Sequence, residues 1–532
     1  MSVSNSKLTV DYKLFLPSVI IIVALCIPLA LYEQQALTLM NSIFEGLVGN
    51  LGWMYIWYPI LITVCALYFS FSRYGNVVLG DPSTKPRFSN FQYLAIIISM
   101  GIGSTIMRTA VVQWASVASD PPFGLTPFSD EALMWGNSFS MYLWGFQNFA
   151  LFAMTAPAMG YVLYVRKKPM MRVSEITRCV FGDRFTDGMG GRILDITFLI
   201  AIVAGSATFL GLGTPMVTTV VAKLLDVERN FQLSFIVTLT WCMLFMFTVY
   251  LGMEKGIQKL SSFNMYLAAV FGILVLILGP TVFIMNYFTD TIGFLFSNYL
   301  TLSFQTESLT DGAATHIYRY SVFWWAYVAT WSLLHGVFAA KISEGRTVRE
   351  VLMAYILASP ALAWVATGLM GGLGVSRYLN GEVPLMEIMQ SGGGEVVAAA
   401  EVIASLPFAG IMLVVFGLLT MVFFGTTLNS TTFAIAAYAS TRDMTKEDPD
   451  RNSRIIWALL IAVLALVLMR VGGLVPLEVT SGLLGFPIMI VQFITVYAAK
   501  KMMDEDRAWI HNVRPVDWKT GTTEALPAAE SV

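Results

Sequence analysis

Apolar runs about as long as a membrane-spanning helix recur along the whole chain. A bilayer core of roughly 30 Å requires about 20 apolar residues in each helix that crosses it. Twelve such runs are present: Leu14–Tyr32, Leu51–Phe71, Phe91–Ser116, Met141–Val165, Leu194–Val221, Phe231–Leu251, Leu260–Tyr287, Val322–Ala340, Val351–Met370, Leu406–Tyr438, Ile455–Leu468 and Leu477–Ala499. Because 56% of the residues are hydrophobic and only 12% are charged, the chain needs lipid as its solvent. We predict an all-α, polytopic membrane protein of about 12 transmembrane helices.

Basic residues gather on one side of the predicted spans. Lys and Arg follow the second, fourth, eighth and tenth runs and flank the end of the sixth, whereas the loop 118–135 carries Asp120, Asp130 and Glu131 without Lys or Arg. Cytoplasmic loops are enriched in Lys and Arg, so we expect both termini to be cytoplasmic. Residues 1–11 lack the features of a signal peptide, which predicts that the first span is retained.

The sequence offers few of the motifs that enzymes use. Its three histidines have no Cys, Asp or Glu at metal-ligand spacing. No nucleophile elbow, phosphate-binding loop or dinucleotide fingerprint can be found either. The four cysteines form no pattern that predicts disulfides. We therefore predict no enzymatic activity, no bound cofactor beyond a coupling ion, and no nucleic-acid partner.

Two spans carry small and polar residues at membrane depth. The third contains the glycine-rich stretch Ser99–Ser104, and the tenth contains the polar stretch Gly425–Thr432. Glycines that break a membrane helix expose carbonyls that a cation or a substrate can use. Alternatively, the glycines let neighbouring helices pack closely, and the hydroxyl groups donate to carbonyls of their own helix. Ser206 and Thr208 in the fifth span add to these residues, which favours an ion and substrate pathway with breaks in the third and tenth spans.

The eighth span begins with a dense aromatic stretch, Phe323–Trp331. On a helix, Trp324, Tyr327 and Trp331 fall at positions i, i+3 and i+7, with Trp325 beside them. Aromatic faces attract cations by roughly 0.5 to 2 kcal/mol each, and a methylated ammonium group suits a cage of such rings. Further candidates for the cage are Trp144, Phe149 and Phe152 in the fourth span and Trp114 in the third. Alternatively, the tryptophans form an interfacial belt or pack against lipid.

The aromatic stretch continues into a basic segment, and the whole run Phe323–Glu350 resembles the signature of the betaine/carnitine/choline transporter (BCCT) family. The resemblance covers nearly the whole chain. Three further segments, Pro121–Leu125, Phe283–Asp290 and Ser440–Arg442, look most like the branch of carnitine/γ-butyrobetaine exchangers.

This resemblance implies a LeuT-like core in which spans three to seven and eight to twelve form an inverted repeat of five helices. It also implies a homotrimer in the bacterial inner membrane and secondary active transport by alternating access. The cargo would be a small organic cation or zwitterion of the glycine betaine, carnitine, choline or trimethylamine class. The implied segments are two peripheral helices (1–90), the first repeat (91–288), an outer interfacial segment (289–320), the second repeat (321–503) and a cytoplasmic tail (504–532).

The resemblance further implies a box of aromatic residues from the fourth and eighth helices around the substrate headgroup. Matched position by position, the members of this box are Trp144, Phe149, Phe152, Trp325, Tyr327 and Trp331. Val328 stands where the family usually has Trp, so we expect a modified box.

The expected ion coupling rests on residues that match the sodium-dependent members of the family and on residues that depart from its sodium-independent exchangers. The third helix keeps the glycine-rich stretch of sodium-dependent members, whereas the Arg and Met of sodium-independent exchangers are replaced by Asn264 and His335. We therefore expect sodium symport, with sodium-independent substrate exchange as the alternative. The expected ligands are the Met100 carbonyl, Thr426 and Thr427 around one ion, and Ser206 and Thr208 near another.

Arg108 lies a turn or so beyond the glycines of the third span, where a charge is costly and usually functional. Three roles are open. The guanidinium pairs with a substrate carboxylate, replaces a coupling cation electrostatically, or extends to the outer surface. A bare amine such as trimethylamine needs no carboxylate partner, and a nearby Arg would repel it.

Overall fold

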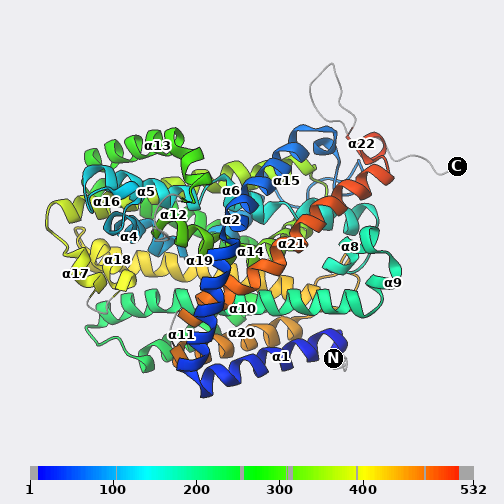
Figure 1. Cartoon of the computed structure of the whole chain (residues 1–532), viewed down its shortest axis with the longest axis horizontal. Helices are drawn as coiled ribbons and strands as arrows, with labels where there is room; N and C mark the ends of the chain where they lie inside the picture. Colours follow the sequence, from blue (N-terminus) through cyan, green and yellow to red (C-terminus); the bar gives the residue numbers. More distant parts are fainter. Residues whose placement is uncertain are drawn as a thin grey trace.

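The chain folds as a bundle of helices (Figure 1). The computed structural model describes residues 10–103, 105–251, 257–306, 308, 316–390, 394–472 and 475–514. The helices that correspond to the predicted runs follow in order: α1 (Tyr12–Leu31), α2 (Glu33–Phe71), α3 (Asn90–Ile102), α4 (Thr105–Ser119), α5 (Asp130–Leu143), α6 (Phe146–Ala153), α7 (Ala156–Gly160), α10 (Met189–Leu225), α11 (Phe231–Leu251), α12 (Gln258–Leu278), α14 (His316–Ile342), α15 (Val348–Met353), α16 (Ser359–Leu379), α19 (Ala409–Tyr438), α20 (Arg451–Gly472) and α21 (Val475–Glu505).

Shorter or peripheral helices connect them: α8 (Val173–Phe181), α9 (Asp183–Thr186), α13 (Thr281–Phe304), α17 (Leu385–Gln390), α18 (Gly394–Ala404) and α22 (Ala508–His511). Helices α8, α9 and α22 lie at the same end of the bundle as the start of α1, and α17 and α18 lie at the opposite end (Figure 1). Ion pairs from Arg172 to Asp11 and from Arg166 to Asp506 tie both ends of the described chain to this first end.

The helices have the length and composition of membrane spans. In the described part of the chain, eight helical stretches are long and apolar enough to cross a membrane, and the bent pair α3–α4 is a ninth. Helices α1, α11 and α20 coincide with the three remaining predicted runs. The prediction of an all-α, polytopic membrane protein is therefore confirmed.

The same packing pattern recurs in the two predicted halves. Helix α3 packs against α12 as α14 packs against α21, and α10 packs against α21 as α19 packs against α12. Likewise, α14 packs against α6 and α7 as α4 packs against α16. If each helix of the first five is replaced by its counterpart in the second five, and the reverse, the first contact of each comparison becomes the second. This exchange is what a LeuT-like inverted repeat requires.

The structure divides the predicted seventh run, Leu260–Tyr287. Helix α12 ends at Leu278, Gly279 and Pro280 form the connection, and α13 begins at Thr281. Proline fixes its own φ and offers no backbone N–H, so it is suited to the residue before a new helix. The Gly279–Pro280 pair is a helix-stop signal that the apolar count alone overlooked.

The third span is broken, as predicted. Helices α3 and α4 meet at an angle of 54°, and Gly103 between them has a φ of 58°. This left-handed conformation favours glycine, and a Cβ on Gly103 would lie 2.8 Å from the Phe209 ring. The break therefore requires a residue without a side chain at this position.

The tenth span is continuous, so the prediction of a second break is wrong. Helix α19 runs through the polar stretch without interruption. The hydroxyl groups of Thr426, Ser430 and Thr432 donate to the Phe423, Thr426 and Leu428 carbonyls of the preceding turn. Because the helix satisfies these hydroxyl groups itself, they do not require a break.

Candidate functional site

A buried pocket lies where the third span breaks. It is lined by Met100, Gly101, Ile102, Gly103, Thr105, Trp144, Asn148, Phe152, Phe209, Trp324, Tyr327, Val328, Trp331, His335 and Thr427. These residues come from α3, α4, α6, α10, α14 and α19 and from the α5–α6 junction. The cavity has a volume of about 30 Å³, which leaves room for about two water molecules.

Aromatic rings form most of the pocket wall. The Trp144 and Trp324 rings meet edge to face with centroids 5.1 Å apart, and Tyr327 lies 6.1 Å from Trp324 and 6.4 Å from Trp331. The Phe209 ring lies 5.5 Å from Trp331. An edge-to-face contact covers one face of one ring of each pair, and the face of an aromatic ring is its electron-rich part.

Hydrogen bonds fix the two tryptophans that meet across the pocket. Trp144 lies at the junction of α5 and α6, and its Nε1 donates to Thr109 Oγ1 on α4 at 3.1 Å. Trp324 Nε1 donates at 3.2 Å to the Leu143 carbonyl and at 3.2 Å to Asn148 Oδ1. Both indole rings are thereby held in place beside the break.

Several predicted aromatic residues line the pocket, and others do not. Trp144, Phe152, Trp324, Tyr327 and Trp331 line it. Three predicted members lie behind the wall instead: the Phe149 ring packs against Phe152, the Trp325 ring is 5.8 Å from Tyr142, and Trp114 packs against Tyr378. The structure therefore brings together part of the predicted box.

Arg108 has a partner that the sequence did not indicate. Its guanidinium forms an ion pair with the Glu395 carboxylate on α18, and Ser116 donates to the same carboxylate at 2.9 Å. Arg108 is not among the residues that line the pocket. A single acid in a connecting helix carries no sequence signal that would have named it as the partner.

The proposed sodium ligands are only partly gathered. Met100 and Thr427 line the pocket, and Thr427 Oγ1 donates at 3.0 Å to the Ser99 carbonyl on α3. Thr426 and Ser206 bond back to the Phe423 and Ile202 carbonyls of their own helices. The Thr208 side chain lies outside the described part of the chain. Among the described residues, no group of three or more His, Cys, Asp and Glu side chains is placed to hold a metal ion.

Sequence reasoning missed Asn148, Phe209 and the pocket role of His335. The His335 ring stacks on Phe152 with centroids 3.9 Å apart. His335 follows Trp331 by four residues, so helical spacing already placed it on the same face of the eighth span. Asn148 and Phe209 carried no comparable signal.

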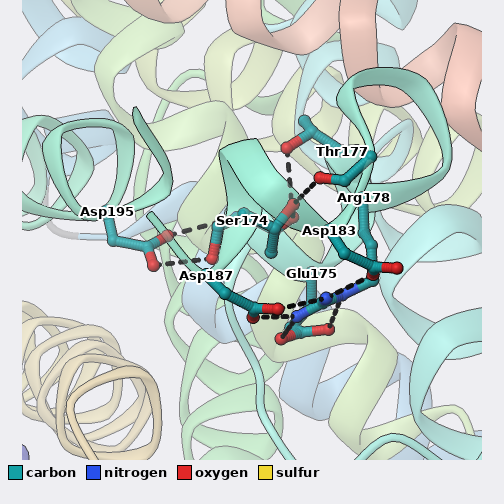
Figure 2. A network of polar contacts seen from close by, with 9 residues as sticks. Ser174, Glu175, Thr177, Arg178, Asp183, Asp187 and Asp195 are labelled. Atoms are coloured by element: carbon teal, nitrogen blue, oxygen red, sulfur yellow. Dashed lines mark hydrogen bonds and ion pairs between the residues drawn. The ribbon is translucent and has the colours of Figure 1, made fainter. Parts of the chain in front are cut away.

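A polar network around α8 and α9, which lie at one end of the bundle (Figure 1), joins α8 to two core helices (Figure 2). The Asp195 carboxylate on α10 accepts hydrogen bonds from the Ser174 backbone and hydroxyl at 3.1 and 2.7 Å, and from the Tyr438 hydroxyl on α19. Arg178 pairs with three acids, Glu175, Asp183 and Asp187. Its guanidinium lowers the pKa of Asp187. Helix α8 is thereby anchored to the ends of α10 and α19.

The fold and the pocket define a multi-pass membrane protein with a buried aromatic site at a broken helix. The model of the family described as BCCT, betaine/carnitine/choline family transporter, matches residues 13–508. The chain belongs to this family and is a transporter rather than an enzyme.

Two known proteins illustrate the similarity. A carnitine transporter of Acinetobacter baumannii is 25% identical over 510 residues, which cover 96% of this chain and 92% of that protein. A substrate-bound, outward-open structure of a Na+-coupled sialic acid symporter aligns with a TM-score of 0.47 and 12% identity, covering 84% of this chain and 86% of the other.

Proposed function

We propose that this protein carries a zwitterion of the betaine or carnitine type across the membrane by alternating access. The observation that carries the proposal is the set of four rings, Trp144, Trp324, Tyr327 and Trp331, that meet at the break in the third span. A trimethylammonium group has no N–H to donate, so its binding depends on such ring faces, each worth about 0.5 to 2 kcal/mol.

Buried polar atoms beside the rings favour a substrate that also carries a carboxylate. Trp324 donates to Asn148 Oδ1, which leaves the Asn148 Nδ2 group as the free end of the amide. Within the described structure, Asn148 Nδ2, Trp331 Nε1 and His335 Nδ1 are buried without a hydrogen-bond partner. Buried polar groups are nearly always paired. A carboxylate accepts bonds from the Asn148 and Trp331 N–H groups, and from His335 in the tautomer that carries its proton on Nδ1. A bare amine leaves them unpaired.

The small volume of the pocket supports a moving wall. A cavity of about 30 Å³ is too small for a trimethylammonium group, so binding requires the rings or the broken helix to move apart. Alternating access supplies such a movement, because one repeat rocks against the other around a central site. The substrate would therefore enlarge the pocket as it binds.

We further propose that transport is driven by sodium, with substrate exchange as the alternative. Thr427 and the Ser99 carbonyl bring oxygen atoms from two helices together beside Met100, and sodium is bound by oxygen ligands. In proteoliposomes, uptake that needs an inward sodium gradient supports symport. Equal uptake in potassium buffer, together with counterflow from substrate-loaded vesicles, would instead establish exchange. The homotrimer, the inner-membrane location and the cytoplasmic termini remain part of this proposal.

The substrate class is tested by a thermal-shift panel on the purified full-length protein. A ligand that binds the native state raises its apparent stability. Carnitine and glycine betaine should raise the melting temperature, and choline and trimethylamine should raise it less, because they lack the carboxylate. A larger effect of choline or trimethylamine would overturn the zwitterion assignment. The shift should shrink in Trp324→Leu but persist in Trp53→Leu, an exposed tryptophan on α2.

A further inference from the structure

A second and much larger cavity lies on the other side of the broken span. It has a volume of about 380 Å³ and lies between α3–α4, α12, α16 and α19. Ile106, Phe271, Leu369 and Phe423 are among its lining residues, and every residue that lines it is apolar. The aromatic pocket, by contrast, contains polar side chains. The larger cavity therefore does not suit a charged substrate.

The cavity opens on a side of the bundle that is exposed and apolar. Ile273 on α12 and Val365 on α16 line it and are 56% and 43% exposed. On α12, Val270 and Ile277 beside them are also exposed. Both helices belong to stretches long and apolar enough to cross a membrane. In a multi-pass membrane protein, such an exposed apolar face lies against acyl chains.

An apolar cavity of this size suits an apolar occupant. Water is excluded, because a water molecule needs two to four polar partners. The volume is more than twice that of an engineered apolar cavity of roughly 150 Å³ that stays dry and takes up benzene. If the cavity were empty, the atoms that line it would also lose van der Waals contacts.

We propose that an acyl chain of a membrane phospholipid enters between α12 and α16 and fills this cavity, and that its binding opposes binding of the substrate. The coupling follows from one residue. Ile102, the last residue of α3 before the break, lines both the apolar cavity and the aromatic pocket.

The two cavities share this wall but have very different sizes. The aromatic pocket must expand to admit a substrate, and the space behind Ile102 is the apolar cavity. Movement of Ile102 into the apolar cavity enlarges the pocket only when the acyl chain has left. Because coupling between two sites is reciprocal, the substrate lowers the affinity for the acyl chain by the same factor. This coupling rests on the proposed function, whereas the acyl site itself does not.

The acyl site is tested by photolabelling of the full-length protein in vesicles of phosphatidylethanolamine and phosphatidylglycerol. The probe is a phosphatidylcholine with a diazirine in its acyl chain, and mass spectrometry locates the labelled peptides. Ala366→Phe on α16 and Ala269→Phe on α12 each place a ring in the cavity. Ala361→Phe is the matched control, because Ala361 is exposed on α16 and does not line the cavity.

Labelling of the lining peptides should fall at least fivefold in Ala366→Phe and Ala269→Phe and stay unchanged in Ala361→Phe. Equal labelling in all four proteins would overturn the acyl site. Lining peptides that stay unlabelled and instead cross-link to a second copy of the chain would overturn it as well, and would assign the cavity to an interface.

The coupling is tested by repeating the labelling with saturating carnitine or glycine betaine. Labelling of the lining peptides should fall about fivefold, as is typical of coupling between two sites, while sucrose leaves it unchanged. Unchanged labelling, at a substrate concentration that shifts the melting temperature fully, would overturn the coupling. If neither compound shifts the melting temperature, the proposed function fails instead, and the labelling without substrate still decides the acyl site.

Discussion

The third and tenth spans carry similar sequence signals but form different structures. Both contain glycine next to hydroxyl residues at membrane depth. The third divides into α3 and α4 at Gly103, and the tenth continues as the single helix α19. Glycine content therefore does not by itself predict a break.

What differs is the surroundings of each glycine and hydroxyl group. Gly103 has a positive φ and faces the Phe209 ring. The hydroxyl groups of α19, by contrast, donate to carbonyls of their own helix, which stays regular. A break is stable where packing requires it and where other groups satisfy the freed backbone. The rings of the pocket lie at the break, and the unbroken α19 contributes Thr427 to the pocket wall.

The largest expected effect comes from the glycine at the break. Gly103→Ala puts a Cβ into a left-handed conformation, which costs about 1 to 2 kcal/mol, and 2.8 Å from the Phe209 ring. We expect substrate affinity to fall at least tenfold and the melting temperature to drop. The control is Gly410→Ala on α19, where nothing lies within 4 Å of the added Cβ. Its stability should stay the same or rise slightly, because Gly410 is the second residue of α19 and the full gain of Ala over Gly applies to a helix interior. Unchanged binding in Gly103→Ala would show that the break is not needed for the pocket.

The second effect separates the rings that face the break from those behind them. Trp324→Leu removes a ring that lines the pocket and should weaken substrate binding about tenfold or more, which corresponds to roughly 1.4 kcal/mol. Trp325→Leu removes a fully buried ring that does not line the pocket. It should lower stability while leaving the dissociation constant within about twofold. Isothermal titration calorimetry on both variants measures the two dissociation constants. A larger loss of affinity in Trp325→Leu than in Trp324→Leu would show that Trp325 belongs to the substrate-binding box.

The sequence predicted the spans and the aromatic face because both follow from regular spacing. Lipid requires long apolar runs, and helical periodicity placed Trp324, Tyr327 and Trp331 together. Long-range partners were beyond such reasoning: Glu395 lies far from Arg108 in sequence, and no local pattern joins them. The break at one glycine stretch and its absence at the other depend on packing between helices, which periodicity does not describe.

A smaller effect distinguishes two adjacent threonines of α19. Thr427 donates to the Ser99 carbonyl on α3 as well as to its own helix, whereas Thr426 donates to its own helix. Thr427→Val should cost about 1 kcal/mol of stability, and Thr426→Val less than about 0.5 kcal/mol. If sodium binds here, only Thr427→Val should raise the sodium concentration for half-maximal uptake. Equal effects of both variants would remove the special role of the contact between α3 and α19.

The smallest expected effect lies far from the break, in the Arg178 network at the end of the bundle (Figure 2). Arg178 lowers the pKa of Asp187, so this pair stabilises the folded state above the ordinary Asp pKa of about 3.9. The contribution is lost as the pH falls through the lowered pKa. Arg178→Gln should therefore melt slightly earlier than the wild type at pH 7, and the difference between the two melting temperatures should shrink as the pH falls through the lowered pKa of Asp187. Arg184→Gln removes an equal charge from the neighbouring α9 and serves as the control. A difference that did not shrink as Asp187 is protonated would mean that Arg178 stabilises this end of the bundle by packing rather than by charge.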